Sequence, residues 1–441
     1  MSQYTSVTLT SAISQLSARL NDSANIYFTG SELQNAIVES LRMFQCLTGF
    51  YRERVPFQTV ANQVFYDLRL VAPNQYAFTI TDNQLLSEIQ SHLLEPITNP
   101  WTGTNQFSIS VISSALKRSR DQFLTDTGIY CTRTTLSGMP DNGRVQLPKT
   151  MLDIRRASWM DSSTLLTYAL ARTDEYAALG YSRSWPQQSQ LPYSYSVAVT
   201  PPVSLQLIPA QTNSGTLDLC ILSSGPDLNC SPSNPVVLGI PDDYGWGVKY
   251  LALADLFSED GPSADPARAQ YCRVLYNMSV GMGLKPVTVL LGRIQEIETP
   301  ISSIEDFDRY RTNWQNVAAT TPVDILQVSP NLIALSPQPD GLYTITLDMV
   351  RSMPIPSAGG DYLQISMDLL EPILDMSQHI ACLKMGGPEF MATTPLRDNF
   401  LKLAGLMNGR LKANIFYNLL LNQPAMRQDM QVSRLMREER R

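Results

Sequence analysis

The stretch that decides the fold is Phe28–Leu68, FTGSELQNAIVESLRMFQCLTGFYRERVPFQTVANQVFYDL. It recurs without a gap, at a constant offset, as Phe107–Leu147, FSISVISSALKRSRDQFLTDTGIYCTRTTLSGMPDNGRVQL. Phe44 matches Phe123, and the Thr-Gly pair at 48–49 matches the pair at 127–128. A period this long is not typical of a solenoid repeat, so it predicts a duplicated helix–strand unit.

Both stretches carry the start and stop signals of a helix. Thr29 and Glu32 have the spacing of a capping box, and Ser108 is the matching cap in the second stretch. Gly49 and Gly128 follow as the residues that end each helix. The first helix is predicted to bury the apolar stripe Leu33, Ile37, Leu41 and Phe44.

The rest of the chain repeats the same order of features. In one part, apolar strands run through a turn at 213–215 and lead to a long helix that starts near Pro241. In the other, similar strands run through a turn at 339–341 and lead to a helix around 367–385. In these later parts of the chain, corresponding features of the two copies are separated by a similar but not constant number of residues, so gaps are needed to align them. A nested duplication explains this order, although common αβα patterns could also produce it by coincidence.

The predicted fold class is therefore α+β, with helical bundle units that each carry an antiparallel β part, present as two copies in one chain. Copy one is expected at residues 8–84 plus 285–412, and copy two is inserted at 85–284. Residues 413–441 are expected to form a C-terminal helix and tail for docking to a partner.

Composition favours folded domains and gives no support for tight DNA binding. The chain has 441 residues, 44% of them apolar, and a net charge of −7. A basic groove for nucleic acid is not predicted from such a balance, although DNA could still pass alongside an acidic protein. Neither a signal peptide at the start nor an apolar run long enough for a membrane span is recognisable.

Catalytic, cofactor-binding and metal-binding motifs are not recognisable either, so no enzyme, cofactor or metal site is predicted. The six cysteines form no CxxC pair and are expected to be free core residues. His92 and His379 lie alone on predicted helices without partners at a useful spacing. The glycine pairs at 245–247 and 281–283 lack the third glycine of a dinucleotide-binding loop.

The order of motifs resembles the head-to-tail adaptor proteins of tailed bacteriophages, the connector family like tail tubular protein A. Copy two carries this resemblance in Leu85–Pro96, Phe107–Gly128, Val145–Pro148, Glu175-Tyr176, Trp185, Leu205–Pro209 and Ile240–Tyr271. Copy one carries it in Phe28–Gly49, Phe65–Leu68, Asp306-Phe307, Trp314 and Ile333–Pro337. A single family unit is about half as long as this chain, which leaves the stoichiometry open.

The resemblance implies a structural virion protein at the phage neck. Such a protein forms a homo-oligomeric ring that joins the portal protein to the tail or nozzle protein. The ring continues the channel through which DNA passes without sequence-specific binding. The implied location is the virion neck, and the host cytoplasm during assembly, with no membrane partner.

The C-terminal segment Gln423–Arg441 mixes arginines with methionines and has a net charge of +2. In the resembling family this segment often docks on the portal, and here it could order against a partner groove. A frayed, solubilising terminus is the alternative. The expected docking residues are Arg427, Arg434, Leu435, Met436, Arg437, Arg440 and Arg441.

Other functions stay open at this stage. Another tail component, such as a nozzle or tail-completion protein, would share much of this pattern, and an unrelated enzyme or binding module is a third possibility. For a ring beneath a twelve-fold portal, twelve chains are the expected number. Six chains could serve if the two copies acted as pseudo-equivalent units, since a ring needs only one repeated heterologous contact.

Overall fold

The computed structural model describes most of the chain up to residue 407. The described residues are 4–71, 78–93, 107–137, 143–181, 183–187, 189–198, 203–231, 233–259, 264–283, 289–299, 301–311, 313–356 and 358–407. They form two compact units. The first unit takes those within Met1–Glu53, Ser91–Leu94 and Val350–Arg441, and the second takes those within Arg54–Gln90 and Glu95–Met349.

The first unit is helical. Its elements are α1 (Leu9–Arg19), α2 (Gly30–Thr48), the 3-10 turn η4 (Met367–Leu369), α10 (Leu370–Cys382), α11 (Gly387–Ala392) and a helix at 394–407. Helix α2 packs along α10, and α1 packs against both. The predicted stripe is in the core, because Leu33, Ile37 and Phe44 have no exposed surface and Leu41 has 3%.

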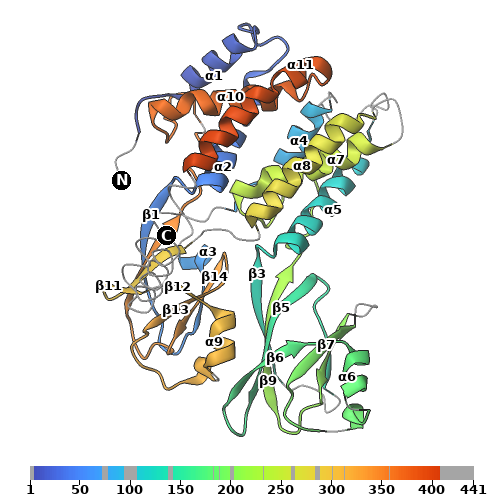
Figure 1. Cartoon of the computed structure of the whole chain (residues 1–441), viewed down its shortest axis with the longest axis vertical. Coiled ribbons are helices and arrows are strands. Elements are labelled where there is room, and N and C mark those ends of the chain that lie inside the picture. Colours follow the sequence, from blue (N-terminus) through green and yellow to red (C-terminus); the bar gives the residue numbers. More distant parts are fainter. Residues whose placement is uncertain are drawn as a thin grey trace, which may run out of the picture. The chain divides into compact units, whose positions relative to one another are not determined.

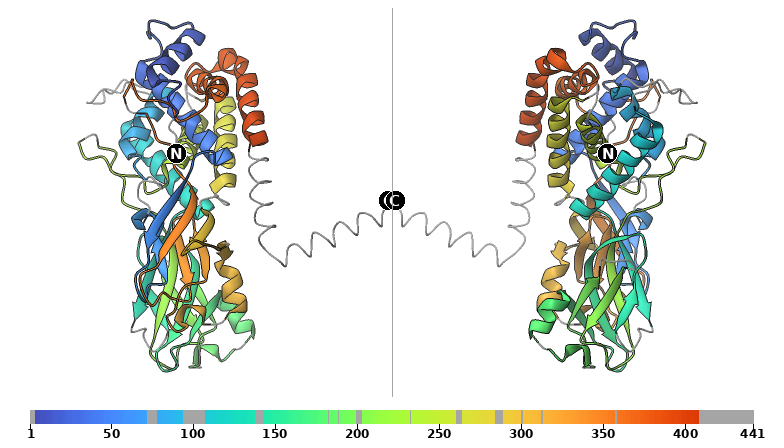
Figure 2. Two further views of the ribbon diagram at one scale, coloured as in Figure 1. Left: turned by 90° about the vertical axis from the view of Figure 1, so that its left-hand side faces the viewer. Right: turned by 90° about the vertical axis from the view of Figure 1, so that its right-hand side faces the viewer.

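The second unit has helices at one end and strands at the other (Figure 2). The helices at that end are α4 (Asp82–His92, in this unit up to Gln90), α5 (Ile109–Thr127), η2 (Asp242–Tyr244), α7 (Gly245–Ser258) and α8 (Pro266–Gly283), whereas the short α3 (Leu68–Val71) lies beside strand β2. Helix α7 is buried almost all round and packs on α5 and α8. Gly247 permits this approach, because a Cβ there would lie 2.3 Å from Ser279 Oγ.

The strands of the second unit form two β modules. Module 1 has two four-stranded sheets that share one apolar core, together with α9 (Ile304–Tyr310) and the turn η3 (Trp314–Asn316). Its strands are β1 (Arg52–Gln58), β2 (Phe65–Asp67), β10 (Val289–Ile294), β11 (Ile297–Thr299), β12 (Ile301–Ser303), β13 (Asp324–Ser329), β14 (Leu332–Ser336) and β15 (Thr344–Val350). Strand β1 belongs to the second unit from Arg54 onward.

Module 2 has one seven-stranded sheet that folds around a core of its own, together with α6 (Glu175–Tyr181) and the turn η1 (Trp185–Gln187). Its strands are β3 (Cys131–Ser137), β4 (Arg144–Gln146), β5 (Met151–Asp161), β6 (Thr167–Arg172), β7 (Ser194–Ala198), β8 (Ser204–Ile208) and β9 (Gly215–Ser223). Figure 1 shows α9 between the two modules and α6 on the far side of module 2.

The two modules have the same strand order. Module 2 runs β3-β9-β5-β6-β7-β8-β4. Module 1 runs β1-β15-β10-β11 and then β12-β13-β14-β2, so β11 and β12 together take the place of β6. Each module also has a cis peptide bond before a proline, at Pro209 and Pro337, directly after the corresponding strands β8 and β14. The fold is α+β, and one series of elements occurs twice.

Most strand pairs are antiparallel, as expected, but each module also contains one parallel pair. These pairs are β6–β7 and β12–β13. The chain passes through α6 or α9 between the paired strands, and a parallel pair needs such a crossover. The sequence pattern of a hairpin-rich sheet did not predict this connection.

The compact units and the predicted domains have different boundaries, because packing and chain order are different properties. The helices expected in copy one form the first unit, whereas its strands lie in the second unit beside module 2. The division into copy one at 8–84 plus 285–412, copy two at 85–284 and a tail at 413–441 stays a prediction.

Candidate functional site: the junction between the β modules

The portal-docking residues expected from the sequence, Arg427 to Arg441, lie outside the described residues. The best-defined cluster of interacting polar side chains from distant parts of the chain is instead the junction between the two β modules. An apolar centre and four sets of polar contacts between the modules are described below, and all of them lie within the second unit.

The centre of the junction is apolar. Leu326 on β13 and Leu332 on β14, with Phe307 on α9, belong to one buried cluster with Cys131 on β3 and Cys220 on β9. Residues from both modules are therefore removed from solvent together. This burial supplies the non-directional part of the attraction between the modules.

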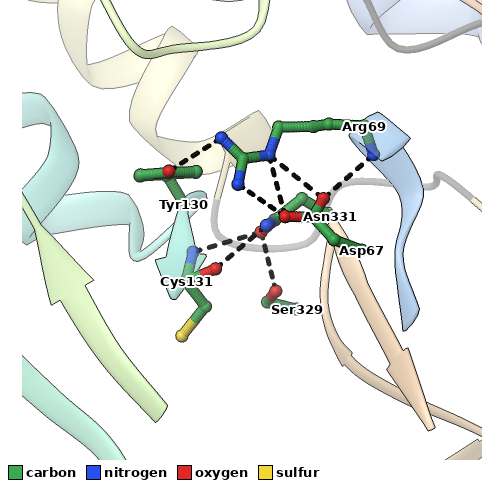
Figure 3. Close-up of polar contacts among 6 residues, drawn as sticks. All are labelled: Asp67, Arg69, Tyr130, Cys131, Ser329 and Asn331. Carbon is green, nitrogen blue, oxygen red and sulfur yellow. Dashed lines mark hydrogen bonds and ion pairs between the residues drawn. The ribbon is translucent and has the colours of Figure 1, made fainter. Parts of the chain in front are cut away.

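Asn331 gives the junction its register. Its side-chain amide donates to the carbonyl oxygen of Cys131 over 2.9 Å and accepts from the Cys131 N–H over 3.1 Å. Ser329 Oγ donates to the same amide oxygen over 2.9 Å (Figure 3). Asn331 has no exposed surface, so this amide acts like a peptide group and satisfies both backbone groups at the start of β3.

Arg69 forms a second contact beside Asn331. It pairs with Asp67 and donates from Nη1 to the hydroxyl of Tyr130 over 2.7 Å (Figure 3). Its guanidinium also lies 4.5 Å from the centroid of the Tyr130 ring. Burial opposes the charge of Arg69, but Asp67 and Tyr130 outweigh it, so the pKa of Arg69 is raised. The arginine therefore stays charged and links β2 to the segment before β3.

Arg156 and Asp308 form a buried ion pair across the junction. Arg156 on β5 donates to the two carboxylate oxygens of Asp308 on α9 over 2.5 and 2.7 Å. Trp314 Nε1 donates to the same carboxylate over 2.8 Å. Burial opposes the charge of Arg156, but the hydrogen bonds and charge of Asp308 outweigh it, so the pKa of Arg156 is raised. Both charges are compensated in a site where an unpaired charge would be costly.

Two asparagines after α9 make the fourth contact. Asn313 Oδ1 accepts from the N–H of Thr167 over 2.8 Å. Asn316 Nδ2 donates to Thr167 Oγ1 over 2.6 Å and to the carbonyl oxygen of Leu165 over 3.1 Å. These bonds fix the loop before β6 against module 1.

A groove of about 300 Å³ lies beside the junction, between the end of α5 and the edge strand β12. Thr127, Arg155, Ser302, Ser303 and Ser329 line it. Hydroxyls and a guanidinium can hydrogen-bond to a polar or anionic group. These lining residues supply no carboxylate or imidazole that could act as a general base.

The cysteines at the junction are protonated thiols. Burial raises the pKa of Cys131 to about 12 and that of Cys220 to about 11, so thiolate is scarce near neutral pH. All six cysteines are free, as expected, and all but Cys46 are buried. Among the described residues, we find no cluster of His, Cys, Asp or Glu side chains that could hold a metal ion.

His379 lies far from these residues in sequence and in a different unit. Its Nδ1 is 2.7 Å from Thr393 Oγ1, and its ring stacks on Phe390. Burial, with Arg397, lowers the pKa of His379 to about 4. The imidazole is therefore neutral near pH 7 and serves the packing of the first unit.

The sequence singled out Trp314 and the pair Asp306-Phe307, of which Trp314 and Phe307 belong to the junction, but not the other residues that hold it. Asn331, Arg69 and Arg156 belong to no motif. The repeat could have pointed to Asp308, because it lies between two matched features. Its counterpart in the other copy, however, is Leu179.

Comparison with known protein families and with curated proteins finds no match to this chain. Within the part of the chain that the structure describes, no helix is both long and apolar enough to cross a membrane.

Proposed function

We propose that this chain is a structural protein of the tailed-phage virion. It forms a ring at the neck that joins the portal to the tail and continues the DNA channel. The observation that carries the proposal is the series of features that occurs twice: a short helix, a capped helix ending in Thr-Gly, strands, an acidic-aromatic segment before a tryptophan, a proline after an apolar strand and a helical pair. This order is the one on which the resemblance to the connector family rests.

The junction suits such a role. Its polar groups pair with one another, through Asn331 with Cys131 and Arg156 with Asp308, and they hold two β modules in one register. A protein that connects two parts of a particle benefits from such fixed contacts between its own β modules. Fold and function are separable, so the proposal rests on the motif order and on its tests.

Electron microscopy of the purified full chain, alone and mixed with portal protein, tests the proposal. We expect rings with a central channel, and capture of the chain by portal. A protein that stays monomeric at high concentration and binds no portal would refute the proposal. Capture by nozzle protein but not by portal would instead support a different tail component.

Ring size and the C-terminal segment are further parts of the proposal. We expect twelve chains by native mass, and a mass of six would support the pseudo-twelvefold arrangement. Removal of Gln423–Arg441 should leave the fold intact and weaken portal binding at low salt, because its five arginines outnumber its three acidic residues. Equal binding with and without this segment would exclude it from the interface.

DNA is expected to pass the ring without a specific site. The net charge of −7 disfavours tight association with phosphate groups. We propose no catalytic activity and no cofactor. A gel-shift assay at physiological salt should therefore detect no sequence preference.

A further inference from the structure

The junction inside the chain joins unlike faces of two like modules. Module 1 contributes the outer face of its β2 sheet (β12-β13-β14-β2), which carries α9. Module 2 contributes the outer face of its strands β3, β9 and β5. A contact of this head-to-tail kind uses one face of each partner. Among the described residues of the second unit, it leaves one face of each kind outside this contact, and we call these the unused faces.

The unused faces can be assigned by strand register. In module 2, Cys220 lies opposite both Arg133 and Arg156. In module 1, Asp348 lies opposite Leu291 and pairs with Arg54, the residue that matches Arg133 in the ungapped repeat. Module 1 therefore has Arg54 at the position of Arg133, Leu291 at that of Arg156 and Asp348 at that of Cys220. We call this surface the β1-sheet face.

The other unused surface is the α6 face of module 2, formed by Tyr176, Ala177, Leu179 and Gly180 on α6 and by Arg144 on β4. Helices α6 and α9 correspond residue by residue from their first positions, Glu175 and Ile304, so Leu179 takes the position of Asp308. Tyr176 is 86% exposed and Leu179 is 39% exposed. Glu175 is the one charged residue of α6, whereas α9 has four.

The two unused faces match each other at the position of the internal ion pair. Inside the chain, Arg156 meets Asp308. At the unused faces, the same two positions hold Leu291 and Leu179, so an ion pair is replaced by two leucines. Replacement of a buried ion pair by apolar side chains of similar volume is energetically acceptable only when both partners change. Here both have changed.

A second position changes in the opposite direction. Phe65 and Cys220 belong to the apolar centre of the junction. The corresponding residues at the unused faces are Arg144, by the ungapped repeat, and Asp348, by register. An apolar pair is thus replaced by side chains of opposite charge. At these two positions the unused faces differ from the internal junction in chemistry but keep its complementarity.

The α6 face also carries one exposed aromatic ring. Inside the chain, Arg133 lies 4.3 Å from the centroid of the Phe65 ring, and Arg156 lies 5.7 Å from that of Trp314. The β1-sheet face offers Arg54, whose side chain is 68% exposed, and the α6 face offers the exposed ring of Tyr176. The Arg133–Phe65 contact is not repeated at its own position, because Arg144 stands there in place of Phe65, and Tyr176, at the position of Glu305, is the ring that the α6 face supplies instead.

We propose that a second copy of this chain docks its β1-sheet face on the α6 face of module 2. The contact repeats between chains the geometry that the two modules have within one chain. In the proposed ring, this would be the contact between neighbouring chains. The inference rests on the proposed function only in that the row of chains closes into a ring. Each further chain would add two modules to the row.

Crosslinking between chains tests the pairing directly. The full-length variants Leu179→Cys and Leu291→Cys are prepared separately, one with a mass tag, then mixed and treated with a short bismaleimide. We expect crosslinked pairs of one tagged and one untagged chain, because the corresponding side chains of Arg156 and Asp308 touch inside the chain. Each variant alone controls for the native cysteines, of which only Cys46 is partly exposed.

A matched pair of surface variants provides a second readout. Tyr176→Asp should lower the fraction of assembled protein at least tenfold. Tyr310→Asp, on the corresponding helix α9 and also 75% exposed, should leave assembly unchanged. Both side chains are exposed, so neither change should unfold the protein.

The outcomes separate this inference from the proposed function. Rings without mixed crosslinks, or equal effects of the two tyrosine variants, would overturn the assigned faces and leave the neck function standing. Mixed crosslinks in open rows that bind no portal would support the faces and refute the neck function.

Discussion

Helices α2 and α5 are nearly the same structure in two different units, whereas the faces of the two β modules have diverged. Each helix has 19 residues and ends at a glycine with a φ of 58°. In each, the threonine before that glycine donates its hydroxyl to a phenylalanine carbonyl, Thr48 to Phe44 and Thr127 to Phe123. Arg156 on β5, in contrast, corresponds to Leu291 on β10. These helix-end contacts, made inside each copy, are retained, whereas Arg156, which contacts the neighbouring module, has changed.

The largest effect is expected from a variant that breaks the ion pair of the junction. Arg156→Leu should lower the free energy of unfolding of the second unit by about 3–5 kcal/mol, because it leaves the Asp308 carboxylate buried without its cation. The double variant Arg156→Leu/Asp308→Leu should recover most of this loss, because it copies the Leu291 and Leu179 pair. Denaturant unfolding of both variants measures the difference.

A solvent-exposed pair in the same module serves as the control. Arg172 and Asp153 form an ion pair with side chains 52% and 38% exposed, so Arg172→Leu should cost less than about 1 kcal/mol. If the double variant were as unstable as Arg156→Leu alone, the two positions would not be interchangeable with a leucine pair.

The retained helices should respond alike to the same truncation. Phe44→Ala and Phe123→Ala should each cost roughly 3–5 kcal/mol, because both side chains are fully buried. Phe44 packs on Phe50 and Phe400, and Phe123 on Tyr244 and Tyr276. The first variant should affect the melting of the first unit and the second variant that of the second unit. No loss for either would show that its stripe does not form a core.

These pairs also show what the sequence could predict. The capped helices, their buried stripes and their glycine stops all follow from local patterns, because a helix repeats its environment every few residues. The junction does not, since Asn331 and Cys131 are 200 residues apart and no periodicity relates them. Burial of Cys131 on the outer face of β3 depends on which sheet covers that face. A single strand does not encode that information.

The repeat could have revealed more than its motifs did. Once the strands of the two modules are placed in register, the junction residues on those strands have counterparts whose chemistry can be compared. That register needs the strand pairing, for example Leu291 with Asp348. The ungapped sequence match covers β1 and β2 but not the later strands, where the spacing between the copies varies.

Acid should change the stability of the two units differently, because a buried histidine in the first unit corresponds to an alanine in the second. His379 on α10 corresponds to Ala254 on α7. Its pKa is lowered to about 4 in the folded protein, from the usual 6.5. The stability that depends on neutral His379 is therefore complete above pH 6.5 and is lost as the pH falls toward 4, by roughly 3 kcal/mol in total.

Unfolding of the unchanged protein and of His379→Asn, at pH 7.5 and at pH 4.5, measures this loss. Asparagine can keep the hydrogen bond to Thr393 and does not titrate, so the variant should lose less stability in acid than the unchanged protein. An identical acid dependence of the two proteins would show that His379 titrates normally.

The smallest expected difference concerns the helix starts. Thr29 and Glu32 bond each other's backbone N–H groups over 2.9 and 3.3 Å, which completes a capping box. Ser108 accepts one bond, from Val111 over 3.4 Å, and the apolar Val111 cannot return it. Thr29→Ala should therefore cost about 1 kcal/mol, and Ser108→Ala about half of that. Thr29→Asn, which keeps a capping oxygen, should cost less than Thr29→Ala. The loss of stability should be larger in the first unit, because Glu32 also forms an ion pair with Lys384 in that unit. A larger loss for Ser108→Ala than for Thr29→Ala would mean that the second bond of the box adds no stability and that the two copies differ at this point for another reason.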